Sequence, residues 1–149
     1  MSSSASTVAD FMIARVLLSV VVLGAGAACQ SPTGPENLPA TVQVVRICGA
    51  LPSVSVAAAS DTVRITGAIV MNVPCYRFTA TASWQRDTLV VTLAATGTSD
   101  ICTQDVAAFS YAITVTGVRS GSVPLRLVYD RYGLPQYFEI ALEQTVQVP

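Results

Sequence analysis

The sequence predicts an all-β fold, an antiparallel β-sandwich of about eight strands with an immunoglobulin-like or transthyretin-like architecture. Valine and threonine supply 17 and 14 of the 121 residues from Cys29 onward, and these β-branched side chains pack well on a pleated sheet. Apolar and polar residues alternate with a period of two along most of this region, which is typical of half-buried strands. Strands with one apolar face each require a second sheet to cover them. A closed barrel is the alternative, but the glycine and bulge pattern that barrel corners need is not evident.

Two short strands are expected first, at 41–48 and 53–58. In the first of them the apolar pair Val42 and Val44 and the pair Val45 and Ile47 lie on opposite parities. A change of parity inside a strand suggests a β-bulge. We therefore expect a bulge between Val44 and Val45.

Six longer strands follow, separated by turns rich in Gly, Pro, Asp and Ser. A turn at Gln85-Arg86-Asp87 joins the strands 75–84 and 88–96 into a hairpin. The other four are expected at 61–71, 106–116, 123–129 and 136–148. Their inward positions are predicted to be Val63, Ile65, Ile69, Met71, Tyr76, Phe78, Ala80, Ala82, Trp84, Leu89, Val91, Leu93, Ala95, Phe109, Tyr111, Ile113, Val115, Val123, Leu125, Leu127, Tyr129, Phe138, Ile140, Leu142, Val146 and Val148, with Glu139 and Glu143 facing outward.

The composition argues against nucleic-acid binding and against catalysis. The chain is 52% hydrophobic and 11% charged, with a net charge of −1, and its eight basic residues are all arginine, so there is no basic surface for a polyanion. It has no histidine, the commonest general base and metal ligand. The carboxylates occur singly, the aspartates at expected turns and Glu139 and Glu143 on a solvent face, and phosphate-loop, nucleophile-elbow and calcium-loop motifs are absent from the sequence. We expect no metal, no cofactor and no enzymatic activity.

The N-terminal 28 residues have the layout of an export signal. Arg15 precedes an apolar stretch from Val16 to Leu23 and a small-residue run from Gly24 to Ala28. The stretch is too short to span a bilayer, which takes about 20 apolar residues. Because Asp10 is unusual in such a signal, Met12 is the expected start of translation. The predicted organisation is a signal peptide at 1–28, a lipidated cysteine and flexible tether at 29–40, and the sandwich domain at 41–149.

The segment AGAAC at 25–29 resembles the lipobox of bacterial lipoproteins. That resemblance implies that Cys29 is diacylated and becomes the new N-terminus, and Gln30 after it implies sorting to the outer membrane. The pattern departs from the family at Gly26, where leucine is usual. Ala25-Gly26-Ala27 is also a site for ordinary signal peptidase, and cleavage there would release a soluble secreted or periplasmic protein.

The tether and one later segment complete the organisation. The stretch 30–40 holds three prolines and few apolar residues, which is typical of an extended linker. The segment from Gly117 to Asp130 faintly resembles the return strand of carboxypeptidase-regulatory and transthyretin-like domains, although Val123 stands where that family has tyrosine. This resemblance implies the fold alone and transfers no functional residue.

The remaining cysteines are Cys48, Cys75 and Cys102, and an exported protein is expected to form a disulfide. The loops 48–75 and 75–102 have equal length, so loop entropy does not choose between them. The hairpin about Arg86 brings Cys75 near Gly97, a short loop from Cys102. We therefore predict a Cys75–Cys102 disulfide and a buried free thiol at Cys48. In a soluble secreted form, a Cys29–Cys48 bridge is an alternative.

An aromatic cluster is the one candidate binding patch. The segment YDRYGLPQYF at 129–138 holds four of the ten aromatic residues around an expected hairpin turn. Parity places Tyr132 at the tip and Tyr137 outward beside Arg131, where they could stack on a sugar or contact a protein. Packing of the rings across the hairpin is the alternative. The predicted function is therefore a membrane-anchored envelope lipoprotein with a binding or structural module, with a protein or glycan as its possible partner.

Overall fold

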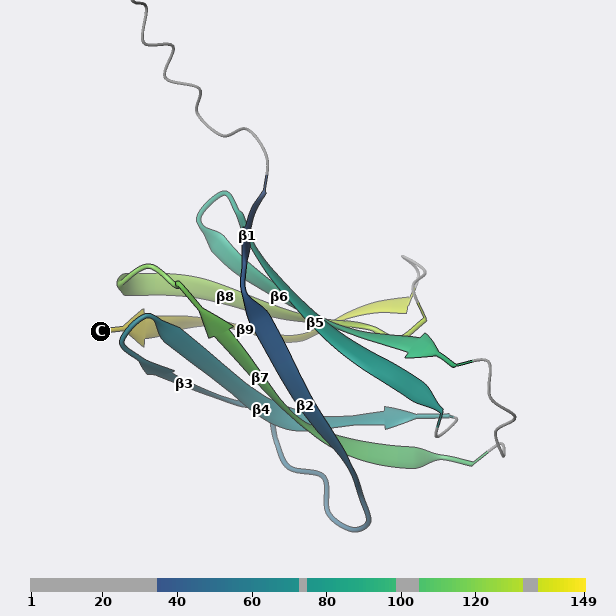
Figure 1. The fold of residues 1–149 in the computed structure, drawn as a ribbon. Coiled ribbons are helices and arrows are strands. Elements are labelled where there is room, and N and C mark those ends of the chain that lie inside the picture. Colours follow the sequence, from purple (N-terminus) through teal and green to yellow (C-terminus); the bar gives the residue numbers. More distant parts are fainter. Residues whose placement is uncertain (1–34, 73–74, 99–104, 133–136) are drawn as a thin grey trace, which may run out of the picture. The chain divides into compact units, whose positions relative to one another are not determined.

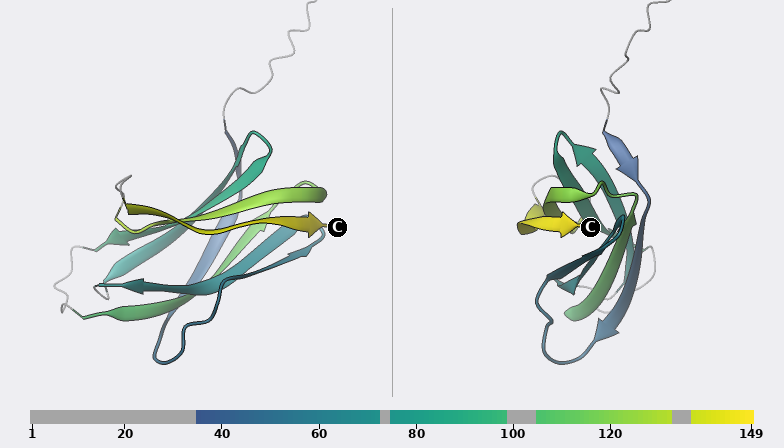
Figure 2. Two further views of the ribbon diagram at one scale, coloured as in Figure 1. Left: turned by 180° about the vertical axis from the view of Figure 1, so that it is seen from behind. Right: turned by 90° about the vertical axis from the view of Figure 1, so that its left-hand side faces the viewer.

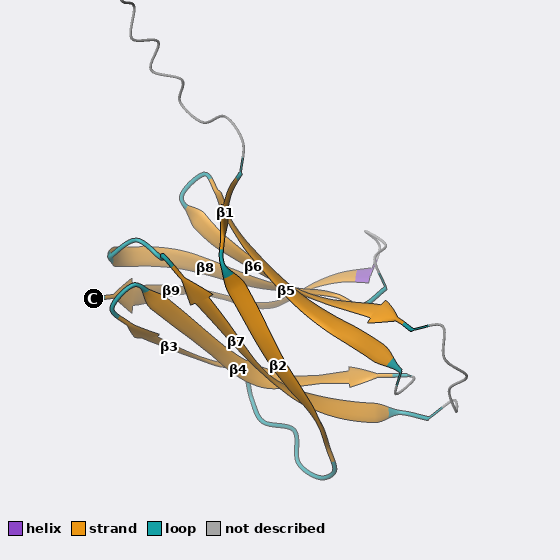
Figure 3. Ribbon diagram, in the orientation of Figure 1, coloured by secondary structure: helices purple, strands orange, loops and turns teal. Residues whose placement is uncertain are grey.

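The computed structural model describes residues 35–72, 75–98, 105–132 and 137–149, all of which belong to the unit Pro32–Pro149. They form two β-sheets that lie face to face as separate layers (Figures 1 and 2). Strands account for most of this region (Figure 3). The prediction of an all-β sandwich is confirmed.

Nine strands make up the sandwich, which is one more than expected. One sheet has the order β1-β5-β6-β8-β9, and the other has the order β2-β7-β4-β3. The strands are β1 (Glu36–Leu38), β2 (Ala40–Ile47), β3 (Ser55–Ala59), β4 (Thr62–Met71), β5 (Tyr76–Gln85), β6 (Thr88–Gly97), β7 (Ala107–Thr116), β8 (Gly121–Asp130) and β9 (Phe138–Val148).

The core lies between the sheets and consists of the inward positions of alternating strands. Along β4, β6, β7 and β8 every predicted inward residue is buried, including Ile65, Leu93, Ile113 and Leu127. The hairpin about Arg86 has the expected register, with Tyr76 opposite Gly97. The period of two in the sequence therefore identified the buried face of these strands correctly.

One strand pair departs from the antiparallel arrangement of the sandwich. β6 and β8 are parallel, with Leu89 opposite Leu125 and Ala94 opposite Asp130. The chain leaves β6, crosses to the other sheet to form β7, and returns to form β8. Each crossing reverses the direction of the chain. After two crossings β8 runs in the same direction as β6, so the two strands pair in parallel.

The predicted tether at 29–40 ends earlier than expected, because β1 lies within it. Glu36, Asn37 and Leu38 pair antiparallel with Trp84, Ser83 and Ala82 of β5. At Pro39 the chain passes from one sheet to the other, and the Pro39 carbonyl accepts a hydrogen bond from the Thr116 N–H at 3.1 Å. Proline lacks an N–H and fits at a strand end, so the prolines that suggested a linker are compatible with this edge strand.

The expected bulge in β2 is absent, since Ala40 to Ile47 pair without interruption with Val115 to Ala108 of β7. Val45 is instead exposed on the outer surface. β2 is an edge strand, and a single exposed apolar side chain such as Val45 is common on protein surfaces.

A bulge occurs in β9 and reverses the predicted parity of its first residues. Leu127 pairs with Leu142, but Val128 pairs with Ile140, so Ala141 is an extra residue. Phe138 and Ile140, which were predicted to be buried, are 54% and 58% exposed. A single inserted residue shifts the preceding side chains to the opposite face of the sheet.

The two sheets are joined by a hydrogen bond between buried tyrosines. The Tyr111 and Tyr129 hydroxyls lie 2.7 Å apart, and the Tyr129 hydroxyl donates to the Ala68 carbonyl at 3.3 Å. The ring of Tyr111 lies over Gly67, where an added Cβ would be 2.4 Å from the hydroxyl oxygen. Gly67 is therefore required for the close approach of the ring to β4.

Candidate functional site

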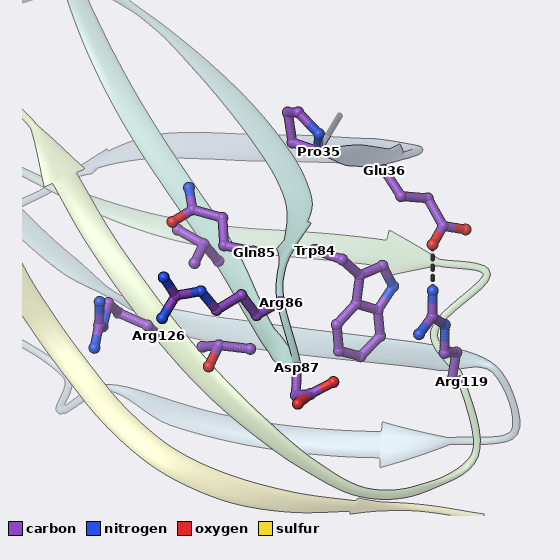
Figure 4. Close-up of a pocket in the computed structure, with 10 residues that line it drawn as sticks. Pro35, Glu36, Trp84, Gln85, Arg86, Asp87, Arg119 and Arg126 are labelled. Atoms are coloured by element: carbon purple, nitrogen blue, oxygen red, sulfur yellow. Dashed lines mark hydrogen bonds and ion pairs between the residues drawn. The ribbon is translucent and has the colours of Figure 1, made fainter. Parts of the chain in front are cut away.

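A surface pocket of about 920 Å³ lies where the β5–β6 turn adjoins β1 and the segment between β7 and β8 (Figure 4). Three regions that are distant in sequence contribute to its wall, namely residues 35–36, 84–90 and 119–126. Its apolar lining is Pro35, Trp84 and Val90, and its charged lining is Glu36, Arg86, Asp87, Arg119 and Arg126, with Gln85 and Thr88 between them.

The β5–β6 turn presents two opposite charges to the pocket. Arg86 and Asp87 occupy the tip of the hairpin, and Arg86 has a φ of 56°. This left-handed conformation is uncommon for a residue other than glycine, asparagine or aspartate. Neither Arg86 nor Asp87 makes an ion pair or side-chain hydrogen bond with any described residue. Both side chains are therefore available to a ligand.

The other two arginines of the pocket are engaged in exposed ion pairs. Arg119 pairs with Glu36, and its guanidinium carbon lies 4.9 Å from the centroid of the Trp84 ring. Arg126 contacts Glu143 at 2.6 Å. Exposed pairs of this kind contribute only about 0 to 1 kcal/mol, so a ligand can rearrange them at small cost.

Trp84 lines the pocket and has a hydrogen-bond donor without a partner. Its side chain is buried, and its indole nitrogen is the one buried side-chain N or O atom of the described residues without a hydrogen-bond partner. Figure 4 shows this nitrogen on the side of the ring that faces Glu36 and Arg119. Because buried donors are usually paired, the indole N–H is a donor that an acceptor of a ligand could satisfy.

This arrangement offers several donors and one acceptor to a ligand. It combines guanidinium and indole donors with one unpaired carboxylate. In the described part of the chain, no group of three or more His, Cys, Asp or Glu side chains could hold a metal ion. A ligand that carries an oxyanion and a cation would match both unpaired charges.

The predicted patch of Arg131, Tyr132 and Tyr137 lies at the other end of β8. The rings of Tyr132 and Tyr137 are edge to face with centroids 4.9 Å apart, and Tyr132 also contacts Tyr76 at 6.3 Å. They are 39% and 46% exposed. The two tyrosines therefore pack against each other, as the structural alternative expected, while keeping part of each ring in solvent.

Arg131 is not free to serve that patch. Its guanidinium donates to the Val70 carbonyl at 2.8 Å and to Glu139 at 2.7 Å. Val70 is in the opposite sheet, so Arg131 joins the two layers. The prediction that Phe138 is buried beneath this hairpin is wrong, because the β9 bulge turns it outward.

The cysteines are only partly described. Cys48 has a free thiol, as predicted, but it is exposed rather than buried, because it lies beyond the end of β2. Cys29 and Cys102 lie outside the described residues, so the lipidation and the Cys75–Cys102 disulfide stay predictions. The hydrogen bond from the Thr98 N–H to the Cys75 carbonyl at 3.1 Å extends the β5–β6 hairpin toward the sequence position of Cys102.

Sequence reasoning missed the pocket because its residues are scattered. Trp84 was predicted as a core residue, and Arg86 and Asp87 as turn residues. The only local signal was an arginine at a tight turn, where asparagine, aspartate or glycine is usual. The approach of Glu36 and Arg119, which lie 83 residues apart, depends on the strand order.

No helix of the described residues is long and apolar enough to cross a membrane. No protein-family model matches the chain, and searches of curated proteins and of solved structures find no significant match.

Proposed function

We propose that this chain is a lipid-anchored protein of the bacterial cell envelope, sorted to the outer membrane, whose β-sandwich is a binding module. The observation that carries the proposal is the signal-like leader, which ends in the lipobox-like segment at Cys29. Two acyl chains on one residue are sufficient for stable membrane anchoring.

Few residues separate Cys29 from the first strand in the sequence, which is compatible with this proposal. β1 begins at Glu36, seven residues after Cys29, and seven extended residues span at most about 25 Å. A lipidated Cys29 would hold the N-terminal side of the sandwich close to the membrane surface. The pocket that includes Glu36 would then lie within the same reach of the lipid.

The second candidate is a soluble secreted or periplasmic sandwich that binds carbohydrate or a protein. The half-exposed rings of Tyr132 and Tyr137 favour it, since such rings stack on sugars and anchor protein partners. The absence of histidine from the sequence supports binding rather than catalysis in either case.

Mass spectrometry of the processed N-terminus tests the anchor. Expression of the precursor in a Gram-negative host is expected to yield an N-terminal peptide that begins at a diacylated Cys29, with the protein in the membrane fraction. Cys29→Ser should move the protein to the soluble fraction, whereas the control Cys48→Ser should stay with the membrane. An unmodified Cys29 behind an N-terminal Ala28 would instead support the soluble candidate.

The proposal includes the Cys75–Cys102 disulfide, which thiol labelling tests. In the native mature protein, a maleimide is expected to label one thiol, that of the exposed Cys48, without any denaturant. Cys48→Ser should abolish the labelling. Prior reduction of the disulfide should expose two further thiols, those of Cys75 and Cys102, to the maleimide. Labelling of three thiols in the unreduced protein would contradict the disulfide.

A further inference from the structure

The unpaired charges in the pocket at the β5–β6 turn suggest a specific class of ligand. Arg86 and Asp87 are adjacent, opposite in charge and without partners among the described residues. A guanidinium is a strong donor to phosphate oxygens, and a carboxylate accepts from a primary ammonium. A single group that carries both charges, a phosphate and an amine a few bonds apart, complements this pair.

The Trp84 side of the pocket can supply contacts to other acceptor atoms of a ligand, and Figure 4 shows it on the opposite side of the turn from the Arg86 guanidinium. The Trp84 indole N–H has no acceptor, and the Arg119–Glu36 pair beside it is exposed. When Arg119 moves off the Trp84 ring, the indole N–H and the guanidinium can both donate to an oxygen of the ligand. This movement costs little because an exposed ion pair contributes little to stability.

Charge does not favour a general attraction to anionic membranes. The lining has three arginines and the carboxylates of Glu36 and Asp87, and Glu143 pairs with Arg126 at its border. The local net charge is therefore close to zero. This balance favours a zwitterionic ligand over a purely anionic one.

We propose that this pocket binds the headgroup of a zwitterionic phospholipid with a primary ammonium, with the phosphate on Arg86 and the ammonium on Asp87. Identifying the source as a membrane rests on the proposed lipid anchor, which limits the distance between the pocket and the bilayer to about 25 Å.

Vesicle flotation of the unlipidated chain from Gln30 to Pro149 tests the proposal. This chain contains all nine strands and the whole described core, so it should fold. We expect it to float with equimolar phosphatidylethanolamine and phosphatidylcholine, and much less with phosphatidylcholine alone or with phosphatidylglycerol and phosphatidylcholine. Soluble glycerophosphoethanolamine should compete more strongly than inorganic phosphate. Equal flotation with all three vesicles, or equal competition by phosphate, would overturn the headgroup assignment.

Three variants separate the two charges from general electrostatics. Arg86→Asn, which suits the left-handed turn, should lower affinity for the phosphatidylethanolamine vesicles about tenfold, as expected for loss of one charged hydrogen bond. Asp87→Asn should remove the preference for phosphatidylethanolamine over phosphatidylcholine. Arg64→Gln, at an exposed unpaired arginine of the other sheet, should change neither. Equal losses in Arg64→Gln and Arg86→Asn would overturn the proposal.

The result is distinguishable from a failure of the anchor. A diacylated Cys29 in a protein whose pocket shows no headgroup preference leaves the anchor intact and removes this inference. A headgroup preference in a protein with an unmodified Cys29 would rule out the lipid anchor. The pocket would then still bind the headgroup, but in a soluble protein that associates with the lipid surface through it. Matching thermal unfolding of the variants and the parent would show that each loss is not a folding defect.

Discussion

Gly67→Ala is expected to lower the free energy of unfolding by about 2 to 3 kcal/mol, because the new methyl group would collide with Tyr111. An ideal Cβ at Gly67 would be 2.4 Å from the hydroxyl oxygen and 2.7 Å from the ring carbon that bears it. Both atoms belong to a rigid ring system that is buried in the core. Relief requires the ring to move, and that movement breaks the hydrogen bond to Tyr129.

Urea unfolding with a matched glycine control measures this effect. At Gly97 the nearest atom to a new Cβ is Tyr76 Cε1 at 4.0 Å, so Gly97→Ala should leave stability unchanged or raise it slightly. In a Tyr111→Leu background, Gly67→Ala should cost less than in the parent. Equal losses for Gly67→Ala in both backgrounds would show that Tyr111 is not the cause.

Stability is expected to fall steeply above about pH 10, where tyrosines of the unfolded chain begin to ionise. Burial, the main cause, and then the hydrogen bond with Tyr129 raise the pKa of Tyr111. Burial also raises the pKa of Tyr129, Glu139 raises it further, and the hydrogen bond with Tyr111 and the charge of Arg131 oppose this shift. The folded state thus holds protons that the unfolded state releases.

The sign follows from proton linkage. Below the unfolded pKa both states are protonated, and the contribution of the buried phenols to stability is complete. As the pH rises above that value, the unfolded state gains free energy of ionisation, and each buried tyrosine costs about 1.4 kcal/mol per pH unit until it ionises in the folded state. Two such groups double the slope.

Urea unfolding at a series of alkaline pH values tests this prediction. Tyr129→Phe should reduce the slope, even though it lowers stability at neutral pH by removing the hydrogen bonds to Tyr111 and Ala68. Tyr137→Phe, at an exposed ring, is the matched control and should leave the slope as in the parent. If the dependence of the unfolding free energy on alkaline pH is the same in Tyr129→Phe as in the parent, the loss of stability comes from another group.

Alternation predicted most of the strands because burial on one face of a sheet repeats every two residues. Leu89, Val91 and Leu93 illustrate this, since their parity alone placed them in the core. The same rule failed at Phe138 and Ile140, because one extra residue at Ala141 reverses it. The sequence around Ala141 has no signal for that insertion, which depends on the pairing of β9 with β8.

Local signals also misassigned the region before β2. Three prolines suggested a linker, yet Glu36–Leu38 form an edge strand. Three residues without a long apolar pattern form a strand here because β5 offers an unpaired edge. Edge pairing is a property of the neighbouring strand, so the sequence of β1 does not show it.

The sequence by itself determined the class of fold and the buried faces of β4, β6, β7 and β8, and it predicts export with Cys29 as the lipid carrier. It did so because side-chain alternation and leader patterns are local. Only the tertiary structure decided the parallel pairing of β6 with β8, the approach of Gly67 to Tyr111, and the pocket around Trp84. These features join residues that are distant in the chain, and strand order, which no local pattern encodes, brings them together.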